Sequence, residues 1–219
     1  MTPDYEKAAI KATETLIKSG ISTTPIDPLP ILKNTPDVFV MTFAEMSEKT
    51  NMDRCDLIRS FGHQNQDSVT TVFNNGGKRE YIVAYNKMLS SKYVDRALAR
   101  ELGHIVLGHD GSRPEEVRDA EAKCFAHHLL CPRPLIHMLQ ATGLRVTVEM
   151  LGNITGCYDY CLSCMRKQPP VHVPADLNRQ LRDQFKPYIM NLFDFLRYAS
   201  SKDGSALADL GNYMEGYTE

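Results

Sequence analysis

The chain has 219 residues, of which 42% are hydrophobic and 24% are charged, so it can form one ordinary core with at most a small additional unit. Its 25 basic and 27 acidic residues give a formal charge of −2. This balance argues against a strong basic field for nucleic acid or an anionic membrane. No apolar run approaches the roughly 20 residues that span a bilayer, and the N-terminal residues lack a signal-peptide pattern. We therefore expect a cytoplasmic protein that binds neither nucleic acid nor a membrane directly.

The N-terminal part of the chain predicts a helix, an extended connector and a strand. Residues 4–19 place apolar side chains at intervals of three and four residues, which is typical of an amphipathic helix, and Gly20 should end it. Residues 24–30 contain repeated prolines, which remove backbone donors, so this stretch should be extended. Residues 38–42 have the β-branched and aromatic content of a strand, and residues 44–60 are weakly helical.

A β-hairpin and two helices are predicted for the middle of the chain. The strand-forming runs 69–73 and 81–85 flank the sequence Asn-Asn-Gly-Gly at 74–77, where glycine allows the positive φ that tight hairpin turns require. Helical patterns follow over about 91–108 and 115–130, joined by a polar loop, and prolines at 132 and 134 should stop the second helix.

The C-terminal part should be helical. Residues 147–167 predict one or two short helices, and residues 175–200 predict a longer helix with a bend near Pro187. We expect the tail after Gly204 to be mobile. The long helix carries an apolar stripe formed by Leu177, Leu181, Phe185, Tyr188, Ile189, Leu192, Phe193 and Leu196. Such a stripe either docks on the parent domain or forms a homodimer or partner contact.

Residues 100–104 read Arg-Glu-Leu-Gly-His, which differs at one position from the zinc-peptidase motif HExxH. In that motif two histidines four residues apart lie on one face of a helix and bind one metal, while the glutamate activates a bound water. Arg100 occupies the position of the first histidine. A pattern with three free positions in five arises easily by chance, so this match alone carries little weight.

The wider sequence strengthens the match, because the chain resembles the ImmA/IrrE family of metallopeptidases over about residues 5–167. That family has an N-terminal helix, a proline-bearing connector, a strand hairpin, a helix reading HELGHxxLGH and, later, EAxxFAxxLLxP. This chain has RELGHIVLGH and EAKCFAHHLLCP in the same order. The resemblance implies an α+β, zincin-like metallopeptidase domain over residues 1–168, with a small β-sheet packed on helices. A helical C-terminal extension would cover residues 169–219.

The resemblance also implies roles for three residues and a substrate class. His104 would be a zinc ligand, Glu101 the catalytic general base, and Glu121 the third protein ligand on the following helix. The expected activity is that of a site-specific zinc metalloendopeptidase, a hydrolase that cuts a helix-turn-helix transcriptional repressor in phage, mobile-element or stress regulation.

Arg100 departs from the family pattern and leaves two functions open. A guanidinium remains protonated and has no lone pair, so it cannot coordinate a metal. It also adds a like charge, which costs about 4 kcal/mol per unit pair at roughly 4 Å and an effective dielectric constant near 20. We expect Arg100 to replace the metal and to pair with Glu121 or Glu101. The chain would then be an impaired metallopeptidase or a non-catalytic pseudoprotease that binds a regulatory protein.

Other side chains could complete a metal site. Cys124 and His128 lie three and seven residues after Glu121, so they share its helical face, where they either rescue metal binding or pack in the core. His109 follows His104 by five residues. On a continuous helix it would turn away by about 140°, and it is more readily explained as a helix-end residue.

The cysteines form a second pattern. Cys157, Cys161 and Cys164 make a CxxxCxxC set that, with Cys131, could hold a structural zinc or a cluster. A buried face of free thiols explains the same spacing, as expected for a protein of the reducing cytosol.

Overall fold

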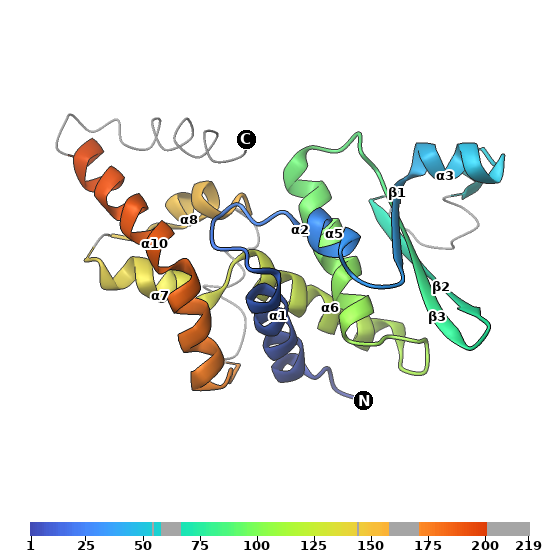
Figure 1. Cartoon of the computed structure of the whole chain (residues 1–219), viewed down its shortest axis with the longest axis horizontal. Coiled ribbons are helices and arrows are strands. Elements are labelled where there is room, and N and C mark those ends of the chain that lie inside the picture. Colours follow the sequence, from blue (N-terminus) through green and yellow to red (C-terminus); the bar gives the residue numbers. More distant parts are fainter. Residues whose placement is uncertain (54, 58–66, 144, 158–170, 201–219) are drawn as a thin grey trace. The chain divides into compact units, whose positions relative to one another are not determined.

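The structure is a computed structural model that describes residues 1–53, 55–57, 67–143, 145–157 and 171–200. The described residues form an α+β structure that consists of helices and one three-stranded mixed sheet (Figure 1). The predicted α+β class is therefore confirmed, while the zincin-like assignment stays a prediction. The helices are α1 (Tyr5–Ser19), α2 (Pro28–Lys33), α3 (Phe43–Thr50), α5 (Ser91–Val106), α6 (Glu115–Leu130), α7 (Arg133–Ala141), α8 (Val148–Thr155) and α10 (Ala175–Ser200), and the strands are β1 (Val38–Thr42), β2 (Ser68–Asn75) and β3 (Lys78–Tyr85).

The principal predicted helices and strands are present. The prediction that residues 24–30 are extended is wrong for residues 28–30, which begin α2; Asp27 caps this helix and Pro28 occupies its first position, where a proline has no backbone donor to lose. A second difference concerns residues 132–134, where the prolines end α6 but also begin α7. Pro132 is the N-cap of α7 and Pro134 lies in its first turn, where the missing backbone donor has no intrahelical partner to lose. The same prolines that stop one helix therefore start the next.

The chain forms two compact units. The first unit contains residues 1–8 and 27–126, and the second contains residues 9–26 and 127–219. The boundary predicted at residue 168 lies outside the described residues.

The sheet belongs to the first unit and has the strand order β1-β3-β2. β1 runs parallel to β3, whereas β2 and β3 form the predicted antiparallel hairpin. Asn75 pairs with Lys78, and the two residues between them, Gly76 and Gly77, have φ values of 57° and 87°. This is the geometry of a tight turn whose central residues both require positive φ, which explains the glycine pair.

Side chains of the sheet pack against helices α3 and α5 in the first unit. On one side of the sheet, Val69 and Ala84 pack in a buried cluster with Phe43, Met46 and Leu57. α3 is fixed at its start by a capping box, in which the side chains and backbones of Thr42 and Glu45 exchange hydrogen bonds. α5 contacts β2 and β3, and this contact positions the RELGH segment against the sheet.

The second unit is helical. The long helix α10 packs against α7, and four residues of its apolar stripe are at most 2% exposed: Leu181, Phe185, Ile189 and Leu192. The side-chain amide of Gln184 donates to the carbonyl oxygen of Leu16 at 3.0 Å, and the hydroxyl groups of Tyr188 and Thr24 lie 2.7 Å apart. The stripe therefore docks within its own unit, as one of the two sequence-based alternatives predicted.

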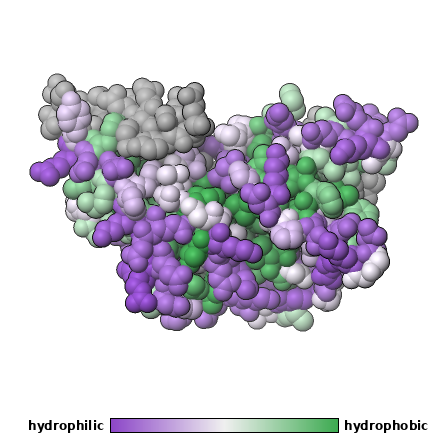
Figure 2. Space-filling view, viewed as in Figure 1, coloured by the Kyte–Doolittle hydropathy of each residue, from purple (hydrophilic) through white to green (hydrophobic). Residues whose placement is uncertain are grey.

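No helix among the described residues is long and apolar enough to cross a membrane. Hydrophilic side chains cover much of the visible face in the space-filling view, with smaller hydrophobic areas between them (Figure 2).

Candidate functional site

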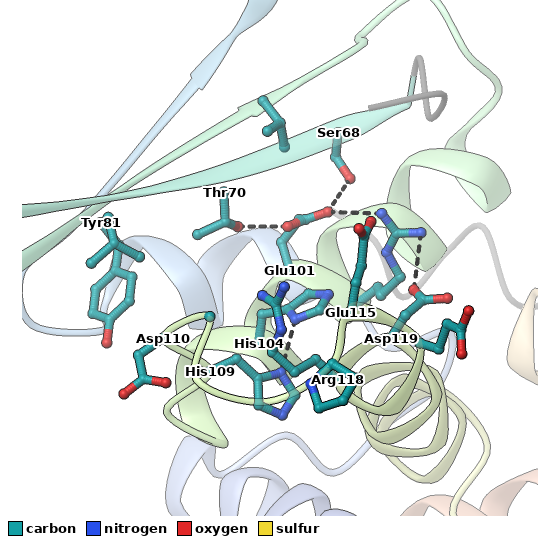
Figure 3. Close-up of a pocket in the computed structure, with 16 residues that line it drawn as sticks. Ser68, Thr70, Tyr81, Glu101, His104, His109, Asp110, Glu115, Arg118 and Asp119 are labelled. Atoms are coloured by element: carbon teal, nitrogen blue, oxygen red, sulfur yellow. Dashed lines mark hydrogen bonds and ion pairs between the residues drawn. The ribbon is translucent and has the colours of Figure 1, made fainter. Parts of the chain in front are cut away.

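The first unit contains a cavity of about 890 Å³ beside the RELGH segment. Strand β2 forms one wall, and helix α5, the loop after it and the start of α6 form the others (Figure 3). The polar residues that reach it from these elements include Thr70, Arg100, Glu101, His104 and Asp119.

Glu101 connects α5 to the sheet. Its side chain is buried, and its two carboxylate oxygens accept hydrogen bonds from the hydroxyl groups of Ser68, at 2.8 Å, and Thr70, at 2.6 Å (Figure 3). Ser68 and Thr70 point to the same side of β2 because side chains alternate along a strand. Both carboxylate oxygens are thus already engaged, which stabilises the buried charge.

Arg100 lies between two carboxylates. One guanidinium nitrogen is 3.4 Å from the carboxylate of Glu101, and another is 3.6 Å from that of Asp119. Asp119 also forms an ion pair of 2.6 Å with Lys123, one turn further along α6. The predicted pairing with Glu101 is therefore present, and Asp119 is a partner that the sequence analysis did not single out.

His109 lies against His104 because the helix ends before it. α5 stops at Val106, and the backbone N–H groups of Gly108 and His109 donate to the carbonyl oxygens of Ile105 and His104, both at 3.0 Å. Gly108 has a φ of 71°. This pair of bonds around a left-handed glycine is a Schellman motif, which folds the chain back over the last helical turn. His109 is therefore a helix-end residue, as one reading of the sequence predicted, and the separation expected on a continuous helix does not apply to it.

A chain of hydrogen bonds runs from His104 to a buried carboxylate. The Nδ1 atoms of His104 and His109 lie 2.9 Å apart, and Nε2 of His109 is 3.0 Å from the carboxylate of Glu121. An ionised carboxylate only accepts, so His109 donates from Nε2 and, when neutral, accepts at Nδ1. His104 then donates from Nδ1. Its Nε2 carries a lone pair that takes no part in this hydrogen bond.

Burial keeps both imidazoles neutral near pH 7. It lowers the pKa of His104 to about 4, with the charges of His109 and Arg100 acting in the same direction and Glu101 opposing them. The pKa of His109 is also lowered by burial, although the hydrogen bond to Glu121 works against this shift. Neutral rings are consistent with the donor and acceptor assignment above.

Glu121 ends this chain and also accepts hydrogen bonds from two other segments. Its carboxylate is 2% exposed and accepts two hydrogen bonds from Arg113, at 2.7 and 2.8 Å, and one from the backbone N–H of Asp4, at 2.7 Å. Burial alone would raise the pKa of Glu121, but the hydrogen bonds from Asp4, His109 and Arg113 outweigh it, so the pKa lies below its usual value. Glu121 therefore remains charged and anchors the N-terminal segment and the loop after α5.

The structure separates Glu121 from the cavity and places Asp119 there instead. Asp119 lines the cavity, whereas Glu121 reaches His104 only through His109. Residues two apart on a helix point about 200° apart, so these two carboxylates cannot face the same space. The sequence did contain one signal, because Glu115, Glu116 and Asp119 recur at helical spacing on one acidic face.

The proposed rescue residues have other surroundings. Cys124 is buried in the first unit, and its sulfur lies 3.6 Å from the carbonyl oxygen of Tyr5. His128 belongs to the second unit and is buried there. Cys131 and Cys157 are buried, while Cys161 and Cys164 lie outside the described residues, so the CxxxCxxC proposal stays a prediction.

The described residues do not fit a catalytic zinc ion. Such an ion uses three protein ligands and keeps one position for water. Nε2 of His104 and the carboxylate of Asp119 could donate, but Arg100 has no lone pair and Glu121 is fully engaged by Arg113 and His109. Within the described residues, no group of three or more His, Cys, Asp or Glu side chains is arranged to hold a metal ion.

No family model, curated protein or solved structure matches the chain.

Proposed function

We propose that this protein is a non-catalytic relative of the zinc metallopeptidases, a pseudoprotease that uses the cavity to bind a segment of a regulatory protein. The observation that carries the proposal is the position of Arg100, whose guanidinium lies 3.4 Å from Glu101 and 3.6 Å from Asp119. A fixed cation between these two carboxylates balances the charge that a metal ion would otherwise balance.

The state of Glu101 also supports a binding role. A general base must reach the proton it removes with a free lone pair. The Glu101 carboxylate accepts hydrogen bonds from Ser68, Thr70 and Arg100, so three of its roughly four lone pairs are engaged and little accepting capacity remains for a substrate water. Glu101 thus stabilises the wall between α5 and β2 and holds Arg100 in place.

The shape and charge of the cavity suit an extended basic segment. Among the described strands, β2 pairs with β3 alone, so its outer edge can add a further strand through backbone hydrogen bonds. The same strand lines the cavity, whose rim carries the acidic residues Asp110, Glu115 and Glu116. A lysine or arginine side chain of the bound segment would meet these carboxylates.

A metalloendopeptidase remains the second candidate because the environment of His104 favours it. The lowered pKa of His104 and the hydrogen bond to His109 leave a neutral imidazole with an available Nε2 lone pair, as a metal ligand requires. In both candidates we propose a helix-turn-helix repressor as the protein partner, in line with the resemblance to ImmA/IrrE peptidases.

The two candidates are tested by measuring zinc, binding and cleavage together. The purified chain is incubated with the helix-turn-helix repressor encoded by the neighbouring gene, and products are followed by mass spectrometry. We expect stable binding, intact repressor and far less than one zinc per chain. Cleavage by the unaltered chain, or one stoichiometric zinc, would contradict the pseudoprotease proposal and favour the peptidase.

A charge reversal locates the binding site. We expect Glu115→Lys at the cavity rim to weaken repressor binding at least tenfold, because it places a cation against a basic segment. The matched control is Glu149→Lys, an exposed charge reversal in α8 of the second unit, which should change the affinity less than twofold. Equal effects of both variants would place the binding surface elsewhere.

A further inference from the structure

The second unit contains a separate pocket of about 250 Å³. It is smaller than the roughly 300–1,000 Å³ of a drug-sized site, so it would accommodate a small molecule. Residues from the start of α7 and from the N-terminal part of α10 line it, and His128 at the end of α6 reaches it as well.

His128 is one of the residues that line this pocket, and it carries a buried polar atom that is unsatisfied in the described structure. Its side chain is 4% exposed, and its Nε2 atom has no hydrogen-bond partner in the described structure. A buried ring nitrogen without a partner loses the hydrogen bond that it makes to water in the unfolded chain, which destabilises the folded state. A ligand that hydrogen-bonds to Nε2 would recover this energy.

The remaining lining residues define the charge of that ligand. The described lining contains the cations Arg133 and Arg182 and the imidazole of His137, and it contains no aspartate or glutamate. Pro132, Pro134, Val171, Val173 and Ala175 form the apolar part of the wall. Arginine binds carboxylate and phosphate oxygens with parallel N–H donors, so the lining offers both anion-binding donors and apolar surface.

His128 suits this role as a neutral donor. Burial lowers its pKa to about 3, and the nearby charges of His127 and Arg133 act in the same direction. The ring is therefore uncharged at pH 7, and its single proton can be held on Nε2 when an oxygen acceptor is present.

We propose that this pocket binds a small organic oxyanion, a carboxylate or phosphate with a short apolar body, through His128 Nε2 and the flanking arginines. The ligand would bind within the second unit. This proposal does not depend on the function proposed for the cavity beside Arg100.

The proposal is tested by titrating the 219-residue chain with isobutyrate, inorganic phosphate and the neutral analogue isobutyramide. Binding is measured calorimetrically, and the imidazole nitrogens of His128 are followed by NMR. We expect saturable binding of an anion with a shift of the His128 signals, and binding of isobutyramide at least tenfold weaker. The tighter of the two anions identifies the head group.

Two exposed arginines on α10 provide a matched pair of variants. Arg182 lines the pocket, whereas Arg179 lies three residues earlier outside the lining. We expect Arg182→Glu to weaken anion binding at least tenfold and Arg179→Glu to change it less than twofold. The proposal is overturned if neither anion saturates, if isobutyramide binds equally well, or if the two variants have equal effects.

Discussion

The Nδ1 atoms of His104 and His109 lie 2.9 Å apart although the residues are separated by five positions in the chain. On an uninterrupted helix these side chains would diverge. They meet because Gly108, with a φ of 71°, ends the helix in a Schellman turn. One backbone conformation therefore connects the RELGH segment to the buried network around Glu121.

Gly108→Ala should destabilise the protein by about 1 kcal/mol, because a residue with a Cβ atom is strained at positive φ. It should also shift the NMR signals of both His104 and His109. Gly111→Ala is the control, since Gly111 has a φ of 87° in the same loop. That variant should have a similar backbone cost, measured by urea unfolding, with smaller changes at the histidines. Unchanged histidine signals in Gly108→Ala would contradict the assigned role of the turn.

Arg100→Met should lower the free energy of unfolding by about 2–4 kcal/mol, because it leaves the buried carboxylate of Glu101 and the neighbouring Asp119 without their shared cation. The double variant Arg100→Met/Glu101→Gln should regain part of this loss, since the uncompensated buried charge is removed. A double-mutant cycle in denaturant measures the coupling. Additive effects of the two substitutions would show that Arg100 does not act as the counter-ion.

Arg100→His should create a zinc site in which Asp119, and not Glu121, is the third protein ligand. In that background, Asp119→Asn should weaken zinc binding by more than about 100-fold, because a ligand is lost. Glu121→Gln should weaken it by about tenfold, because Glu121 orients His104 only through His109. Competition with a chromophoric chelator measures both affinities. A larger loss for Glu121→Gln would support the ligand set implied by the family resemblance.

Asp95 should make the stability of the protein depend on pH. Burial, reinforced by the charge of Asp27, raises the pKa of Asp95 from 3.8 to about 7. The folded chain therefore binds a proton more tightly than the unfolded chain, so the free energy of unfolding falls as the pH rises from about 4 to about 7.

Asp95→Asn should consequently stabilise the protein at pH 8 by about 1–2 kcal/mol, an amount reduced by solvent screening of the partly exposed carboxylate. The gain should shrink toward zero as the pH approaches 4. Denaturant unfolding at several pH values measures it, with the exposed Asp183→Asn in α10 as the control. A gain that does not vary with pH would rule out titration of Asp95 as the cause.

Gly103→Ala should destabilise the protein by about 1–3 kcal/mol through overpacking. A Cβ atom at this position would lie 3.1 Å from the carbonyl oxygen of Ala122 and 3.1 Å from the ring of Phe125. The backbone contact cannot relax without moving α5 away from α6, whereas the ring can. Adding Phe125→Leu to Gly103→Ala should therefore recover only part of the loss caused by Gly103→Ala, as measured by thermal unfolding. A full recovery would show that the ring alone limits the approach of the helices.

The local pattern of the sequence determined most of the secondary structure. Apolar spacing located α1, α5, α6 and α10, and the Asn-Asn-Gly-Gly segment located the turn between β2 and β3. These features depend on short-range backbone preferences, which a single sequence records directly. The sequence alone also showed that Arg100 cannot be a metal ligand, because a guanidinium has no available lone pair in any fold.

The tertiary structure alone decided which side chains share the cavity. The sequence grouped Glu121 with His104, but the rotation of α6 turns Asp119 toward Arg100 and commits Glu121 to Arg113 and the backbone of Asp4. That rotation depends on how α6 packs against α5 at Gly103, and on where the N-terminal segment lies. Both are contacts between residues distant in the chain, and periodicity within one helix does not encode them.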